Sequence, residues 1–269
     1  MKPDIRRNLR RGVYVIPTFL TVMNLFFGFR CIVNSIRAMQ YITEGRSDLA
    51  ARAFEVAAVS LLIAAIFDTF DGLIARSLDA TSDFGKEYDS LADVVTFGAA
   101  PAVLVYCWGL HPLDRLGGGI AFLFLVAVSL RLARFNVITG KSDYRYFVGL
   151  PSPAGALTLA AVVNYAPAPV RDEKFAMVML LVTIFVAFAM VSPVRWRSQK
   201  GLVMQKERSL MTFLVVALVI GVASKWPREF LFVTAISYLL SGPLVKLWSI
   251  AFPSRTAPPS ETLEPVESP

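Results

Sequence analysis

The chain has 269 residues, of which 55% are hydrophobic and only 17% are charged, and its mean hydropathy is +0.57. That composition excludes an ordinary water-soluble globule and wholesale disorder. The only two cysteines, Cys31 and Cys107, exclude a disulfide-rich secreted scaffold, and both lie in apolar runs where we expect small buried side chains. The composition therefore predicts an all-α, polytopic membrane helical bundle.

Eight apolar runs have roughly the length needed to cross a bilayer core, which takes about 20 residues. In chain order they are approximately Tyr14–Ile36, Leu49–Ile74, Val94–Leu110, Gly119–Phe135, Ser152–Val170, Phe175–Val191, Leu210–Ser224 and Phe230–Ile250. We expect about eight transmembrane helices in one integral-membrane domain over residues 14–250. Residues 1–13 would form a basic juxtamembrane segment, and residues 251–269 a disordered, Pro-rich tail.

The net charge of +7 comes from 27 Lys and Arg against 20 Asp and Glu. With the N-terminus in the cytoplasm, most of the basic residues fall on that side, as the positive-inside rule requires. Anionic lipid headgroups at that surface explain the basic excess, so no nucleic-acid partner is expected. The first run is too long for a signal-peptide core and is interpreted as a retained span. The sequence predicts a protein of the cytoplasmic membrane with its N-terminus inside.

Four carboxylates, Asp68, Asp71, Asp89 and Asp93, lie at or near membrane depth around the junction of the second and third runs. An ionisable group at that depth is costly unless it is paired, hydrated or bound to metal, and it marks a functional site by default. On helices, Asp68 and Asp71 share one face, and Asp89 and Asp93 share a face of the next helix. Because the link between the helices is short, we expect the two faces to surround one pocket. Divalent cations with oxygen ligands would neutralise this concentration of charge.

Small residues lie on the same face as the first two acids. Gly72 and Ala75 have almost no side chain, which leaves room for a ligand against the backbone. The alternative interpretation is that the acids only form interfacial ion pairs with Arg76 and Lys86. Four carboxylates on two converging faces favour the pocket.

One spacing pattern joins these residues: Asp68-x2-Asp71-Gly72-x2-Ala75-Arg76-x8-Gly85-x3-Asp89-x3-Asp93. It resembles the signature of the CDP-alcohol phosphatidyltransferase family at every specified position. The resemblance implies a six-helix catalytic core, usually dimeric, that displaces CMP from a CDP-linked lipid by an alcohol, with two divalent metals (Mg or Mn) on the cytoplasmic side. By resemblance, Asp68, Asp71 and Asp89 would hold the metals on the pyrophosphate. Asp93 would join the second metal and act as the catalytic general base. The nucleotide would lie against Gly72, Ala75 and Gly85, with Arg76 as a fixed counter-charge for phosphate.

Residues 16–28, 131–136 and 147–154 resemble one branch of that family, the phosphatidylserine synthases, and residues 97–102 are similar too. In the first stretch Thr18 stands where Asn is more usual. This resemblance implies transfer of the phosphatidyl group from CDP-diacylglycerol to L-serine. Arg131 and Arg134 are then the expected clamps for the serine carboxylate, although snorkelling of basic side chains explains the pair as well. Asn24 suits either ligand binding or a helix-packing hydrogen bond.

Three alternatives stay open. Another acceptor, such as choline, inositol phosphate or glycerol phosphate, would use the same chemistry, but a phosphorylated acceptor would require several basic residues facing the site. A membrane prenyltransferase would carry its two acidic motifs on helices well separated in the chain. A cation transporter would place charged or broken helices in symmetric halves, whereas this chain concentrates its acids in one hairpin.

Overall fold

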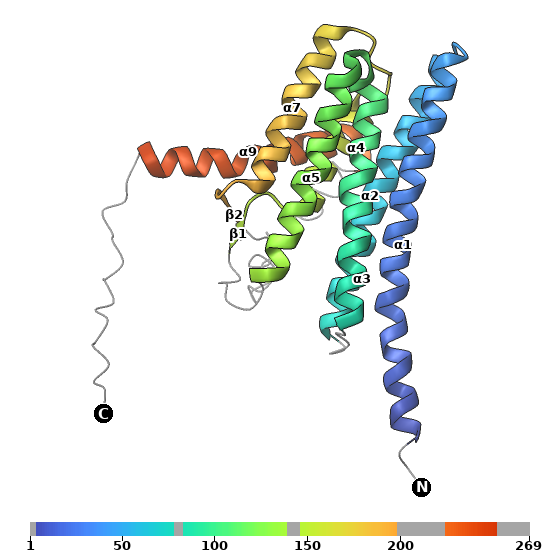
Figure 1. Ribbon diagram of the computed structural model, residues 1–269, viewed down its shortest axis with the longest axis vertical. Helices are drawn as coiled ribbons and strands as arrows, with labels where there is room; N and C mark the ends of the chain where they lie inside the picture. The colour runs from blue at the N-terminus through green and yellow to red at the C-terminus, as the bar shows by residue number, and fades with distance from the viewer. Residues whose placement is uncertain (1–3, 78–82, 139–145, 198–223, 252–269) are drawn as a thin grey trace.

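The computed structural model describes residues 4–77, 83–138, 146–197 and 224–251, and these form a helical bundle (Figure 1). Its helices are α1 (Asp4–Thr43), α2 (Ser47–Ser77), α3 (Asp83–Asp93), α4 (Ala100–Val105), α5 (Asp114–Ile138), α6 (Ser152–Tyr165), α7 (Glu173–Val191) and α9 (Pro227–Ala251). The π-helical segments η1 (Val94–Ala99) and η2 (Tyr106–Leu110) and the 3-10 turn η3 (His111–Leu113) join α3 and α4 to α5. Strands β1 (Tyr146–Val148) and β2 (Arg195–Arg197) form a short antiparallel pair. The all-α class is confirmed, with this short pair as the addition.

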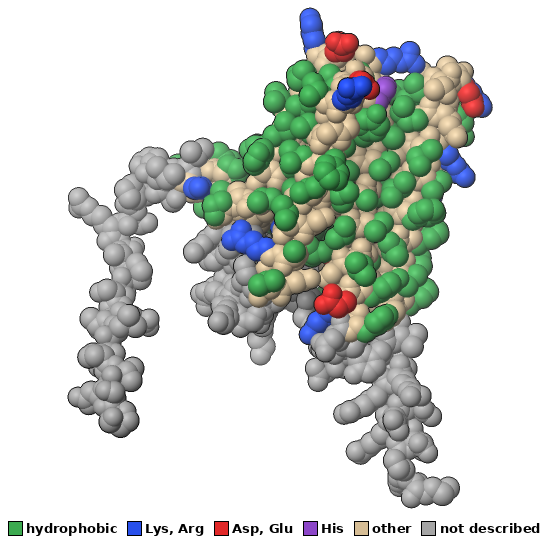
Figure 2. Space-filling model, viewed as in Figure 1, with side chains coloured by type: hydrophobic (Ala, Val, Ile, Leu, Met, Phe, Trp, Pro, Cys, Tyr) green, Lys and Arg blue, Asp and Glu red, His purple; other side chains and the backbone are tan. Residues whose placement is uncertain are grey.

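Five helical ranges of the described chain are long and apolar enough to cross a membrane: Pro17–Thr43, Ser47–Ile74, Phe84–Val137, Glu173–Val191 and Pro227–Lys246. The third range holds two antiparallel passes, one from α3 to η2 and one along α5 (Figure 1). Large apolar side chains such as Phe29, Ile66 and Phe122 are more than half exposed on the flanks. Figure 2 shows hydrophobic side chains covering the flank while charged ones gather toward its two ends. The chain is therefore an integral membrane protein.

The predicted count of eight spans is not confirmed, and several boundaries differ. The third pass begins at Asp83 rather than Val94, because the polar turn that carries the acids continues directly into the apolar helix. α6 has 14 residues and ends at Tyr165, since Pro167 and Pro169 follow and cannot extend it. The predicted run at 210–224 lies outside the described residues except for its last position, as does nearly all of the expected tail.

Helix α1 packs along α2 through faces made of small residues. The buried face of α1 consists of Thr21, Asn24, Gly28, Cys31, Ser35 and Ala38, spaced alternately three and four residues apart. The facing side of α2 is rich in alanine, with Ala53, Ala57 and Ala64 buried. Small side chains let membrane helices approach closely and gain packing contacts that lipid cannot supply. Cys31 and Cys107 are both buried and free, as expected.

The remaining helices close the bundle around a core that includes Trp108, Phe54 and Phe124. α5 packs on α7, and α6 packs on α2 and α9. The indole Nε1 of Trp108 donates to the carbonyl oxygens of Ala166 and Ala168 at 2.9 and 3.0 Å, which anchors the chain after α6. This architecture sets the ends of α2 and α3 beside the N-terminal half of α1.

Candidate active site

Helices α2 and α3 bring acidic residues together where α2 ends and α3 begins. One carboxylate oxygen from each of Asp68, Asp71 and Asp89 lies within 4.8 Å of the others. Asp71 is buried, whereas Asp68 and Asp89 are half-buried. The structure thus gathers three of the four predicted carboxylates, from two helices, within reach of a single ion.

Asp93 lies one helical turn beyond Asp89 on α3, outside that trio. It is close enough to Asp68, Asp71 and Asp89 to interact electrostatically with all three. Its Oδ1 accepts a hydrogen bond of 3.3 Å from Nδ2 of Asn24. The four acids therefore form one cluster, in which Asp93 contacts Asp68 but lies outside the trio that suits one ion.

Helix α1 contacts this acidic cluster from a third side. The hydroxyl of Thr21 donates to Oδ2 of Asp71 at 3.1 Å, and Asn24, three residues later, donates to Asp93. Sequence reasoning left the role of Asn24 open and did not single out Thr21. The signal that identifies them is polar residues at i and i+3 in an apolar span, the same spacing that identified Asp68 and Asp71.

The π-helical segment η1 begins directly after Asp93. The backbone N–H of Ala100 bonds to the carbonyl of Val95, five residues back, so this turn of the helix is wider than an α-helical turn. Pro101 lacks the N–H that would bond to the residue four before it, which contributes to the irregular ladder. Such π-bulges commonly occur at functional sites, where they change the direction of nearby side chains.

The donor set at the trio fits a divalent metal ion. Carboxylate oxygens are hard ligands suited to Mg²⁺ or Mn²⁺. Oδ1 of Asp89 is buried and has no hydrogen-bond partner among the described residues. A buried anionic oxygen without a partner is costly, and a bound cation removes that cost.

The residues expected to hold the CDP-lipid lie on the same two helices. Gly72 follows Asp71 directly, and Gly85 is in the first turn of α3. Ala75 and Arg76 lie in the last turn of α2, where the description covers the helix but not their side chains. All four positions therefore lie near the acidic cluster along the backbone of these two helices.

The two predicted serine clamps occupy different environments on α5. Arg131 is half-buried, and its Nη1 donates to Oγ of Ser152 at 2.9 Å. Its Nε is buried and lacks a partner among the described residues. Arg131 also interacts electrostatically with Asp93 and with Tyr238 of α9. Arg134, one turn further along α5, is exposed.

Ser152 and Tyr238 were missed as site residues from the sequence. Ser152 opens α6, inside the 147–154 stretch whose pattern had been noted, so its position carried a signal. Tyr238 carried none, because it lies in an apolar run more than a hundred residues from Arg131 and only the fold brings the two together.

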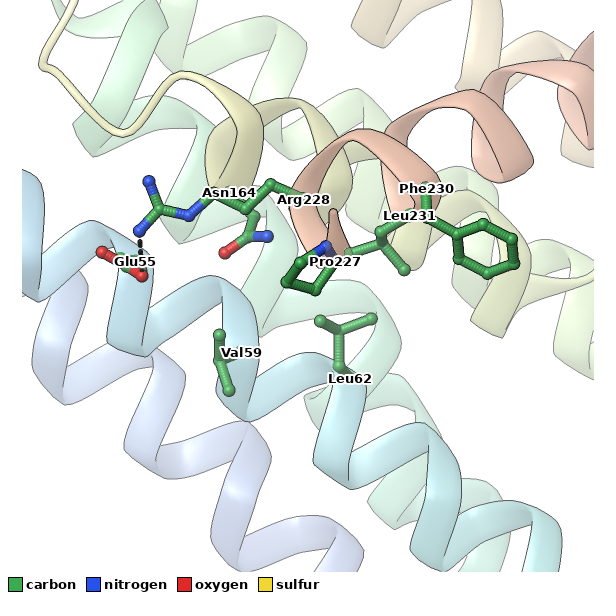
Figure 3. Close-up of a pocket in the computed structure, with 8 residues that line it drawn as sticks. All are labelled: Glu55, Val59, Leu62, Asn164, Pro227, Arg228, Phe230 and Leu231. Atoms are coloured by element: carbon green, nitrogen blue, oxygen red, sulfur yellow. Dashed lines mark hydrogen bonds and ion pairs between the residues drawn. The ribbon is translucent and has the colours of Figure 1, made fainter. Parts of the chain in front are cut away.

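A separate cavity of about 310 Å³ lies between α2 and the start of α9 (Figure 3). An ion pair between Glu55 and Arg228 crosses it, and Asn164 of α6 lines it. Glu55 precedes Asp68 by 13 residues on α2, about 20 Å along the helix. This cavity is therefore remote from the acids, and its ion pair connects α9 to the bundle.

Comparison with known proteins identifies the family. The model of the family described as CDP-alcohol phosphatidyltransferase matches residues 14–191, which include all four acids and Arg131. The chain belongs to the CDP-alcohol phosphatidyltransferase family. It is therefore an enzyme, a transferase, and the carboxylates gathered between α2 and α3 are its candidate active site.

Individual relatives share one name. A CDP-diacylglycerol–serine O-phosphatidyltransferase of Helicobacter pylori is 30% identical over 234 residues, covering 86% of this chain and 90% of the relative. The protein of that name from Bacillus subtilis is 33% identical over 153 residues, covering 56% and 77%. That from Mycobacterium leprae is 37% identical over 169 residues, covering 60% and 50%.

Proposed function

We propose that this enzyme transfers the phosphatidyl group of CDP-diacylglycerol to the hydroxyl of L-serine, giving phosphatidylserine and CMP. The observation that carries the choice of serine is Arg131, a half-buried residue beside Asp93 whose buried Nε has no hydrogen-bond partner among the described residues. Guanidinium groups in such settings bind carboxylates. Serine supplies a carboxylate close to its reacting hydroxyl, and the names of the relatives agree with that acceptor.

The chemistry assigned to the acids follows from their positions. Asp68, Asp71 and Asp89 would hold divalent metal on the pyrophosphate, and Asp93 would contribute to a second ion. Bound metal supplies charge neutralisation for the phosphate oxygens and the leaving group. The carboxylate of Asp93 takes the proton of the serine hydroxyl. The serine oxygen then bonds to the phosphorus that carries diacylglycerol, while the bond from that phosphorus to the bridging oxygen breaks and CMP departs.

The other predicted residues have supporting roles in this proposal. Gly72, Ala75 and Gly85 leave the backbone open to the nucleotide, and Arg76 balances phosphate charge. Arg131 binds the serine carboxylate, with Ser152 orienting the guanidinium through their hydrogen bond. Arg134 provides attraction for anionic lipid or substrate at the exposed end of α5.

The proposal places the site at the cytoplasmic face of the inner membrane. The N-terminus of α1, the end of α2 and the start of α3 share one end of the bundle (Figure 1). When the N-terminus is placed in the cytoplasm, most Lys and Arg of the sequence also fall on the cytoplasmic side of the membrane. Family resemblance further predicts a homodimer surrounded by membrane lipids.

Choline, inositol phosphate and glycerol phosphate are the alternative acceptors. Choline carries no carboxylate for Arg131. The phosphorylated alcohols would favour several basic side chains around Asp93. Among the contacts of the described residues, Arg131 is the basic residue near Asp93. These features favour serine.

The test is purified enzyme in detergent with CDP-diacylglycerol, Mg²⁺ or Mn²⁺, and each labelled alcohol in turn. We expect CMP release and labelled lipid with serine, and neither with choline, inositol phosphate or glycerol phosphate. CMP release with inositol phosphate but not with serine would overturn the acceptor while leaving the family unchanged.

A further inference from the structure

We propose that Asn24 is a positioning residue for the general base, and that its side-chain N–H holds the Asp93 carboxylate in the orientation that accepts the acceptor's proton. This inference rests on the proposed function, because it assumes that Asp93 is the base. It adds a residue on α1, outside the acidic signature, to the apparatus for proton transfer.

The contact itself joins two distant parts of the chain. Nδ2 of Asn24 donates to Oδ1 of Asp93 at 3.3 Å, and the two residues are 69 positions apart. Asn24 is fully buried, so water does not compete for this bond. A donor on one carboxylate oxygen fixes the orientation of the group and directs the other oxygen toward the substrate.

Two further contacts hold helix α1 against η1 near Asn24. The hydroxyl of Thr96, on η1 just past Asp93, donates to the backbone carbonyl of Asn24 at 3.3 Å. One turn along α1, Gly28 lets the helix lie directly on the Thr96 backbone. The Asn24 amide and the Asp93 carboxylate are thus held in register by contacts of their own two helices.

The side-chain carbonyl oxygen of Asn24 is evidence against a purely structural role for this residue. Its Oδ1 is buried and has no hydrogen-bond partner among the described residues. A buried carbonyl without a partner lowers the stability of a fold, and an apolar side chain of similar size avoids that loss. An asparagine at this position is therefore explained by what its N–H does for Asp93.

The experiment compares three substitutions at Asn24 in the full-length enzyme. Asn24→Leu keeps the volume and removes both polar atoms, Asn24→Asp keeps an oxygen acceptor and removes the N–H donor, and Asn24→Gln keeps the amide on a longer arm. Asn34→Ala is the matched control, because Asn34 lies on the same helix and, among the described residues, its Nδ2 bonds to the carbonyl of Arg30 alone. Asp93→Asn defines the activity that survives without the base.

We expect kcat to fall about 10–100-fold in Asn24→Leu and Asn24→Asp, the usual effect of losing a hydrogen bond to a functional carboxylate. The KM for CDP-diacylglycerol should change less than twofold, and Asn24→Gln should recover part of kcat. Mn²⁺ binding by the substrate-free protein and the melting temperature of Asn24→Leu should match the wild type. Asn34→Ala should be indistinguishable from wild type.

Two results would overturn the inference. Wild-type kcat in Asn24→Asp would show that the oxygen, and not the N–H, is the functional atom. Loss of Mn²⁺ binding and melting temperature together with kcat in Asn24→Leu would show a structural role. The acceptor panel is independent of both results, because a different preferred alcohol would still depend on the same N–H.

Discussion

Arg131 and Arg134 carry the same side chain one turn apart on α5, yet their surroundings assign them different roles. Arg131 is half-buried, bonds to Ser152 and lies beside Asp93, whereas Arg134 is exposed. The Nε–H of Arg131 is buried without a hydrogen-bond partner among the described residues, and an N–H shielded from water binds a carboxylate more strongly than an exposed one. An exposed arginine at a membrane surface contributes only about 1 kcal/mol toward anionic groups.

At the residue scale we therefore expect Arg131→Gln to raise the KM for serine at least tenfold, which corresponds to about 1.4 kcal/mol of lost binding. The KM for CDP-diacylglycerol should change little, because the proposed ligand of Arg131 is the serine carboxylate and not the CDP-lipid. Steady-state kinetics with each substrate varied in turn measures both values.

Arg134→Ala is the matched variant on the same helix. We expect it to weaken serine affinity more than CDP-diacylglycerol affinity, but to a smaller extent than Arg131→Gln. An equal loss for both substrates in Arg131→Gln would contradict its assignment as the carboxylate clamp.

At the scale of elements, α1 is the frame on which the site is assembled. Thr21 and Asn24 reach Asp71 and Asp93, on two different helices, from one face of α1. A side-chain carbon placed on Gly28 would lie only 2.8 Å from Cα of Thr96 and 2.6 Å from its hydroxyl oxygen. The absence of a side chain at Gly28 therefore sets how closely α1 approaches η1.

Gly28→Ala should lower stability by about 1–3 kcal/mol, the usual cost of overpacking, because the obstructing atoms include backbone. It should also reduce kcat, since separating α1 from η1 moves Asn24 away from Asp93. Thermal unfolding in detergent and turnover measure the two effects.

Gly119→Ala is the control for this prediction. Gly119 lies in α5, and a side-chain carbon there meets nothing within 4 Å. Alanine should stabilise that helix by about 0.5–1 kcal/mol through its higher helix propensity. If both alanine variants shift the melting temperature upward, the close approach at Gly28 is not a constraint.

At the scale of the whole molecule, the bundle concentrates negative charge at one end of an apolar body. Asp68, Asp71 and Asp89 lie close enough together to hold one metal ion, and Asp93 adds a fourth carboxylate nearby. Like charges gathered in a partly buried cluster repel one another and lower the stability of the folded state. A divalent cation bound among them replaces that repulsion with attraction. A cation that binds the folded state and not the unfolded state raises the free energy of unfolding by mass action.

Adding Mg²⁺ or Mn²⁺ at about 100 times its Kd should therefore stabilise the detergent-solubilised protein by about 2.7 kcal/mol, and a chelator should reverse the effect. Asp71→Asn should abolish the metal-dependent part of the melting temperature. Asp48→Asn should preserve it, because Asp48 is an exposed acid in the first turn of the same helix. If the melting temperature of the wild type does not change when the metal is added, that result would count against a metal site.

The sequence by itself determined the membrane class and the acidic pair of helices. Long apolar runs identify helices because a bilayer leaves the backbone no other way to satisfy its hydrogen bonds, and Asp68, Asp71, Asp89 and Asp93 stand out because charge is costly in that setting. Their spacing placed them on helical faces, and a short link implied that the faces meet. All of these are local properties of the chain.

Only the tertiary structure decided which distant residues complete the site. The hydrogen bonds from Asn24 to Asp93 and from Arg131 to Ser152, and the proximity of Tyr238 to Arg131, each join helices far apart in sequence. Helical periodicity gives the face of a residue but not the neighbour that covers it, which depends on how small residues such as Gly28 let the helices pack. The length of α6 and the helical start at Asp83 differed from expectation because apolar composition does not define where a helix ends.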